Sequence, residues 1–145
     1  MPHLLKKFVF VTTDEIADEM NNGQLLGFKD ARIIMQYITD ARIQKSRAKK
    51  TDTVMHEFHL HRADASVIAL AQEVNGFLAT EDRQIEKICL ITQTKVTNTA
   101  ALLYHLWKHK EFSNEQTLLL LDLLTRNGYN KEICLKLKEK VIGGT

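Results

Sequence analysis

The first half of the chain alternates short apolar runs with amphipathic stretches. Residues 8–11 (Phe-Val-Phe-Val) form a continuous apolar run, typical of a strand that is buried on both faces. Thr12 and Glu15 follow at the spacing of a capping box and predict a helix that ends at residues 21–23 (Asn-Asn-Gly). A second amphipathic helix is expected from about Asp30 to Gln44.

The middle of the chain repeats this pattern of strand and helix. Residues 53–60 alternate in part and predict either a strand or an extended approach to the next helix. Residues 63–74 have a clear helical pattern, and residues 77–79 form a short apolar strand. A further helix is expected from residues 80–82 to about Ile88, and a further strand at residues 89–92. Strands separated by helices favour a parallel sheet.

The chain after about Thr97 predicts helices only. The first helix is expected from Thr99 to Lys108. Ser113 and Gln116 form a capping box before a Leu-rich helix that ends near Gly128, and Asn130 is placed to cap a last amphipathic helix. We therefore expect a helical extension packed on the sheet.

Composition narrows the class of protein. The 145 residues, of which 44% are hydrophobic and 26% charged, exclude a disordered or collagen-like chain and suit one compact domain. The net charge of +2 neither favours nor excludes a polyanionic partner. Cys89 and Cys134 lack the spacing of a disulfide framework or a zinc site, and the apolar run at residues 8–11 is too short to span a membrane. We expect a cytoplasmic protein without a signal peptide or membrane anchor.

One segment carries charge of a single sign. Five basic residues and no acidic one lie between positions 42 and 50, namely Arg42, Lys45, Arg47, Lys49 and Lys50. The segment is either a solvated helix end or mobile loop, or a site that contacts phosphate groups. Both interpretations remain open from the sequence.

Two other clusters also have two interpretations. The histidines at positions 56, 59 and 61 resemble a metal site, but an extended stretch would place His56 opposite the other two, which favours a structural or solvent-facing role. Tyr104, Trp107 and Phe112 lie among basic residues and either stack unpaired bases or pack in a core or dimer interface.

Three acidic residues occupy equivalent places in the predicted sheet. Glu19 lies on a helix that follows a strand, Asp64 at the start of a helix, and Asp82 just after a strand. Ligands bind at the carboxyl ends of parallel strands, so these carboxylates are expected to converge there and to hold Mg²⁺ or Mn²⁺. In the alternative, Asp64 and Asp82 only cap helices and stabilise their dipoles.

The amino-acid sequences of these segments resemble those of the PIN-domain nucleases. In residues 62–73 an Asp opens an Ala-rich helix, and residues 76–83 form a hydrophobic strand that ends in Thr-x-Asp, as the family has them. Residues 10–20 look like the family's strand and helix with its Glu. Residues 95–103 and the helices after them look like the extension of a PIN-like branch of predicted nucleic-acid-binding proteins.

The resemblance implies a fold and an activity. The fold is an α/β, PIN-like parallel sheet flanked by helices over residues 1–95, with a helical C-terminal extension over residues 96–145. The activity is Mg²⁺- or Mn²⁺-dependent cleavage of RNA, in many members as the toxin of a toxin-antitoxin pair. The alternative is a non-catalytic binding or assembly module with a degenerate metal site.

The resemblance also assigns roles to residues. Glu19, Asp64 and Asp82 match acidic positions of the metal site, and Glu81 is a possible auxiliary ligand. Arg42 to Lys50 would guide single-stranded or structured RNA. The expected protein partners are an antitoxin and a second copy of the chain, and no membrane is involved.

One part of the family pattern is not found. The family begins with a hydrophobic strand that ends in Asp, and only seven residues precede Phe8. Three explanations are open: the chain is a truncated product, a partner supplies the strand, or residues 8–11 occupy the central position. In the last case Asp14 or Glu15 replaces the lost acid, and Glu19 moves out of the site.

Overall fold

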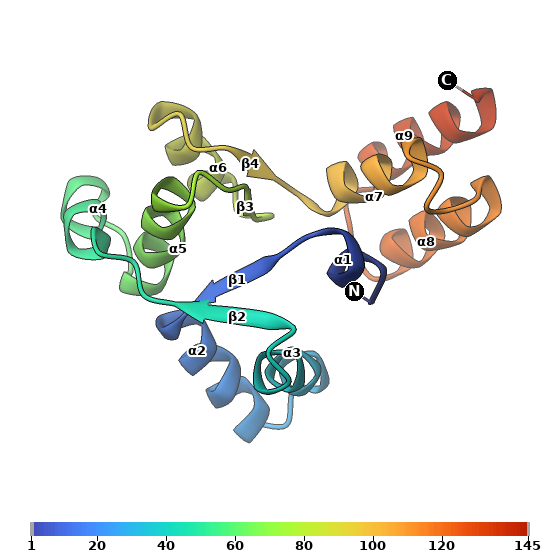
Figure 1. Cartoon of the computed structure of the whole chain (residues 1–145). Helices are drawn as coiled ribbons and strands as arrows, with labels where there is room; N and C mark the ends of the chain where they lie inside the picture. Colours follow the sequence, from blue (N-terminus) through green and yellow to red (C-terminus); the bar gives the residue numbers. More distant parts are fainter. Residues whose placement is uncertain (1, 145) are drawn as a thin grey trace. The chain divides into compact units, whose positions relative to one another are not determined.

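The structure is a computed structural model that describes residues 2–144 (Figure 1). It forms two compact units, which we call the first unit (the chain up to Leu78, with Asp82–Val96) and the helical unit (Ala79–Glu81, with the chain from Thr97). In chain order the elements are α1 (Pro2–Lys7), β1 (Phe10–Thr13), α2 (Asp14–Leu25), α3 (Lys29–Thr39), β2 (Ile43–Ser46), α4 (Thr51–Phe58), α5 (Arg62–Glu73), β3 (Leu78–Ala79), α6 (Arg83–Ile91), β4 (Val96–Thr97), α7 (Thr99–Lys108), α8 (Asn114–Arg126) and α9 (Lys131–Gly143).

Strand β1 pairs in parallel with β2, from Phe10 opposite Ile43 to Thr13 opposite Ser46. Helices α2 and α3 connect the two strands and lie beside them in Figure 1. The predicted strand at residues 8–11 was wrong by two positions, because the Phe8 amide still donates to Leu4 at the end of α1 and Val9 is exposed. The buried end of β1 is instead Thr13.

Helix α2 continues through the Asn-Asn-Gly at residues 21–23, where the sequence predicted its end. A Cβ at Gly23 would approach the Ala31 Cβ to 3.1 Å, so the glycine permits close packing between α2 and α3. The chain turns at Gly27, which has a φ of +91° that other residues rarely adopt. Helix α3 ends before Gln44, the predicted end, because the following residues enter β2.

Helix α4 replaces the strand or extended stretch that was predicted at residues 53–60. Val54 and Phe58 are four residues apart, a spacing that fits a helix face as well as a partly alternating strand. Both side chains pack against the core that α5 provides. Packing against α5 therefore stabilises a helix, which was neither of the two structures predicted for this segment.

Helix α5 is the centre of the first unit and confirms the predicted helix. Ala65, Ile68 and Ala69 are fully buried. Their burial lets α2, α4 and α6 pack around α5. Small alanine side chains are suited to such close contacts.

Strand β3 confirms the predicted strand, whereas the strand predicted at residues 89–92 was wrong. Residues 89–91 are the last turn of α6, in which Ile85, Ile88 and Cys89 form a buried helical face. The partner of β3 is β4, through hydrogen bonds from Leu78 N to Lys95 O (2.8 Å) and Thr80 N to Thr97 O (3.0 Å). The fold is α/β with short parallel pairs, as expected, but it has two pairs in the described residues instead of one sheet.

The helical unit contains the three helices that the sequence predicted. Ser113 and Gln116 form the capping box of α8, and the Asn130 side chain caps α9. Leu103, Leu121 and Cys134 form the buried core between the three helices. The starts of α8 and α9 depend on local caps, so the sequence alone could predict them.

Candidate functional site

A pair of buried hydroxyl groups joins the end of β1 to the start of α5. Thr13 Oγ1 lies 2.7 Å from Ser66 Oγ, and Ser66 Oγ donates to Ala63 O at 2.6 Å. Thr13 also caps α2, because its Oγ1 accepts from Ile16 N at 3.3 Å, so the capping box predicted at Thr12 and Glu15 was wrong by one position. The carboxyl end of β1 and the first turns of α2 and α5 therefore meet at one place in the first unit.

Asp14 opens α2 at this place and contacts one basic side chain in β2 and one just after it. Its Oδ1 lies 3.6 Å from Lys45 Nζ, and its Oδ2 lies 3.4 Å from Arg47 Nε. The parallel register brings the residues after Thr13 and Ser46 to the same edge of the β1–β2 pair. Asp14 thus offsets part of the positive charge of the basic segment.

Glu15 is the most enclosed carboxylate at this edge. Its Oε1 lies 3.6 Å from Arg62 Nε, and the same guanidinium donates to Asp52 Oδ1 at 2.6 Å. Glu15 Oε2 is buried and has no hydrogen-bond partner within the described chain. A buried carboxylate oxygen without a donor is energetically costly, and the nearby guanidinium reduces that cost.

Asp64 and Glu19 lie on the two helices that meet here. Asp64 is half-buried in the first turn of α5, and Glu19 is exposed on α2, one turn after Glu15. Among residues 2–144 neither carboxylate forms a hydrogen bond or ion pair. Helix α2 packs against α5, so both residues belong to adjacent elements of the first unit.

Asp82 caps α6 as one of the two sequence interpretations expected. Its Oδ1 accepts from Gln84 N at 2.7 Å and from Ile85 N at 3.2 Å. Thr-x-Asp at the end of β3 therefore has a structural use in this chain: the carboxylate satisfies amides at the helix start.

Glu81 accepts a hydrogen bond from the backbone at another helix start, in the helical unit. Its Oε1 accepts from Thr99 N at 2.7 Å. Burial raises the pKa of the Tyr129 hydroxyl, and the Glu81 carboxylate raises that pKa further. Glu81 thus connects the segment before α6 to the beginning of α7.

The predicted acids do not form a metal centre by themselves. Within residues 2–144 no group of three or more His, Cys, Asp or Glu side chains is placed to hold a metal ion. We therefore assign no metal to Glu19, Asp64, Asp82 or Glu81, and their role as ligands stays a prediction. The extended stretch assumed for the histidines was wrong, since His56 lies in α4, His59 ends that helix and His61 precedes α5.

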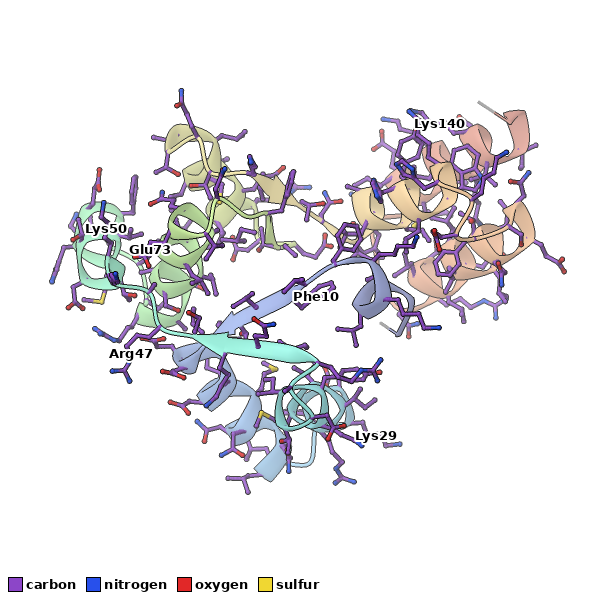
Figure 2. The ribbon with its side chains drawn as sticks, viewed as in Figure 1. Phe10, Lys29, Arg47, Lys50, Glu73 and Lys140 are labelled. Atoms are coloured by element: carbon purple, nitrogen blue, oxygen red, sulfur yellow. The ribbon has the colours of Figure 1, made fainter. Side chains whose placement is uncertain are left out.

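The basic segment is structured and faces solvent. Its first part is β2, and the backbone amides of Lys49 and Lys50 donate to Glu73 Oε1 at 2.8 and 3.0 Å (Figure 2). The Arg42 guanidinium lies 5.0 Å from the centroid of the Tyr37 ring. All five basic side chains are exposed. The helix end or mobile loop of the first interpretation is thus a strand followed by a loop held by Glu73.

Sequence reasoning did not single out Ser66 or the contact between Arg62 and Glu15. The position of Asp14 and Glu15 directly after a strand was the only signal for this edge. The partners on α5 are about fifty residues away in the chain, so no local pattern could identify them.

Comparison with protein families identifies the family of this chain. A family model described as a PIN domain matches residues 2–139, which is most of the chain. No curated protein and no solved structure matches. In the part of the chain that the structure describes, every helix is too short or too polar to cross a membrane.

Proposed function

Because the chain belongs to the PIN-domain family, we propose that it acts on RNA as a metal-dependent endoribonuclease. The match over residues 2–139 is the observation that carries this proposal. PIN domains have a nuclease-type fold and generally use divalent metal ions. RNA as the substrate and Mg²⁺ or Mn²⁺ as the ion are expectations from that membership.

Two carboxylates of the first unit support a site near the start of α5. Asp64 and Glu19 have no partner in the described residues and lie on helices that pack together. Carboxylate oxygens are hard ligands, and such ligands favour Mg²⁺ or Mn²⁺. Because these acids do not form a metal centre in the described residues, the metal dependence is inferred from the family alone, and the cleavage experiment tests it.

The basic segment supports an RNA path on the same unit. Lys49 and Lys50 are exposed, and their backbone is held by Glu73. Asp14 leaves most of the segment's positive charge available. Phosphate groups are bound by such lysine and arginine side chains without regard to sequence.

A second candidate function is a non-catalytic RNA-binding or assembly module. The carboxylates of Asp82 and Glu81 are bound by backbone amides, which is a structural use of two predicted site residues. The toxin role, an antitoxin and a second copy of the chain are further proposals that follow from the family.

The experiment measures cleavage of a fluorogenic single-stranded RNA by the full chain with Mn²⁺, with Mg²⁺ and with EDTA. Asp64→Asn removes one charge from a residue without a partner, so we expect an intact fold and cleavage reduced on the order of a hundredfold. The matched control is Glu115→Gln, which also removes an acid from a first helical turn and should leave cleavage unchanged. Cleavage that survives both Asp64→Asn and EDTA would contradict the proposal, and RNA binding without any cleavage would favour the second candidate.

A further inference from the structure

The helical unit carries an aromatic ring with two ammonium groups close to it. Tyr104 on α7 is half-buried, and its ring centroid lies 5.8 Å from Lys108 Nζ and 5.3 Å from Lys140 Nζ. Lys140 belongs to α9 and is labelled in Figure 2. The Trp107 ring lies 5.6 Å from the Tyr104 ring. We call Tyr104, Trp107, Lys108 and Lys140 the Tyr104 surface.

The positive charge of this surface is not offset by carboxylates. Lys108 and Lys140 form no ion pair among the residues that the structure describes. By contrast, Lys136 lies 2.9 Å from Glu132, and Lys138 pairs with Asp122. Helix α7 contains no acidic residue at all. The two lysines beside Tyr104 are therefore available to an anion.

The aromatic rings are held at the surface and are not fully buried. Trp107 Nε1 donates to Asn114 Oδ1 at 2.8 Å, which fixes the ring against the start of α8. Both Tyr104 and Trp107 keep an intermediate exposure, whereas Leu103 and Leu106 of the same helix are buried. The leucines of α7 are thus buried, and its aromatic rings are left partly open to solvent.

We propose that the Tyr104 surface binds single-stranded RNA. An unpaired nucleotide has a planar base that stacks on an aromatic ring and a phosphate that attracts an ammonium group, and this surface offers both within a few ångströms. Exposed cation–π contacts are weak, so the lysines can turn from the ring to phosphates when a base stacks. An acidic peptide would use the two charges but not the paired rings. The inference rests on the proposed function for its ligand class, and it concerns binding, not cleavage.

The experiment uses the full chain, a fluorescein-labelled single-stranded oligouridine and EDTA, so that no metal-dependent cleavage intervenes. Fluorescence anisotropy gives the affinity at several salt concentrations. Trp107 is the only tryptophan of the chain, so its emission reports on this surface. We expect oligouridine to quench that emission as it binds.

The variants separate stacking from charge. Tyr104→Leu should weaken binding roughly five- to hundredfold, as expected for the loss of one stacked base, whereas Tyr104→Phe keeps the ring and the affinity. Lys108→Gln combined with Lys140→Gln should lower the slope of log affinity against log salt by about 1.4, since each phosphate contact on a single strand contributes about 0.7. Lys136→Gln is the control on α9, the helix of Lys140, because Glu132 already neutralises Lys136.

The outcomes decide the inference separately from the proposed function. Unchanged affinity and salt slope in the double lysine variant, with no quenching of Trp107, would overturn it while leaving the cleavage test with Asp64→Asn unaffected. If oligoglutamate of equal charge competes as well as oligouridine and Tyr104→Leu alters neither, the surface binds an acidic protein and the inference is again overturned. Circular dichroism of each variant checks that the helical unit remains folded.

Discussion

Asp82 shows how one side chain can combine a structural role with a proposed catalytic one. Its carboxylate caps α6, and the resemblance to the PIN family predicts that it is also a metal ligand. Asn is as good a helix cap as Asp, whereas Ala lacks a side-chain acceptor. The two substitutions therefore distinguish the cap from the negative charge.

We predict that Asp82→Asn preserves stability and abolishes metal-dependent RNA cleavage. Asp82→Ala should also lower the free energy of unfolding by about 0.5–2 kcal/mol, because the amides of α6 lose their acceptor. Urea denaturation and the RNA cleavage assay measure the two effects. An Asp82→Asn variant that cleaves RNA like the unchanged chain would show that Asp82 serves only as the cap of α6.

Cys89 gives a prediction for alkaline pH. Burial raises the pKa of its thiol, and the nearby Glu86 carboxylate raises it further. The unfolded chain loses this proton above about pH 8.5, while the folded chain retains it. Ionisation then favours the unfolded state, so stability is complete below that pH and falls as the pH rises.

We expect this loss of stability between the unfolded and the folded pKa of the thiol, and its size depends on how far burial raises that pKa. Urea midpoints at pH 8 and above measure it, and Cys89→Ala should show a smaller dependence on pH. Tyr129, whose pKa is also raised, contributes equally to the pH dependence of the unchanged chain and of the Cys89→Ala variant. Identical slopes in the two proteins would exclude Cys89 as the cause.

At the scale of elements, a carboxylate of α5 holds the end of the basic segment. Glu73, the last residue of α5, accepts from the amides of Lys49 and Lys50. We predict that Glu73→Ala accelerates hydrogen exchange at those two amides and weakens RNA binding, because the loop must then be ordered during binding. Glu57→Ala on α4 is an exposed control that should change neither quantity. Unchanged exchange at both amides would show that the loop is held in another way.

The elements that the sequence predicted correctly have local determinants. The start of α8 depends on Ser113 and Gln116, and the start of α9 on Asn130, all within one turn. The errors concern segments whose pattern fits more than one structure. Residues 89–91 are apolar and could form a strand, but Ile85, Ile88 and Cys89 share a buried helical face against α5. Which partner an apolar run meets depends on distant residues.

At the scale of the whole molecule, RNA binding has to come from the distribution of charge. The net charge is only +2, so the overall field is weak and local clusters dominate. Among these, the segment from Arg42 to Lys50 carries five basic residues and no acidic one. Binding through this segment should depend on salt concentration.

We predict that Arg47→Glu combined with Lys49→Glu weakens RNA binding and flattens its salt dependence by about 0.7 per lost phosphate contact. Lys29→Glu, an exposed lysine outside the segment, is the control for a change in net charge. Anisotropy titrations with the same oligouridine measure both slopes. An unchanged slope in the double variant would dismiss the segment as an RNA contact.

The sequence by itself determined the caps of α8 and α9, the α/β class and the PIN resemblance that the family match supports. These features are encoded within one turn or one short segment, where a few side chains act on neighbouring backbone. Only the tertiary structure decided that residues 53–58 are helical, that Thr13 meets Ser66, and that Lys140 of α9 lies near the Tyr104 ring. Such contacts join distant residues, and their geometry depends on how whole elements pack.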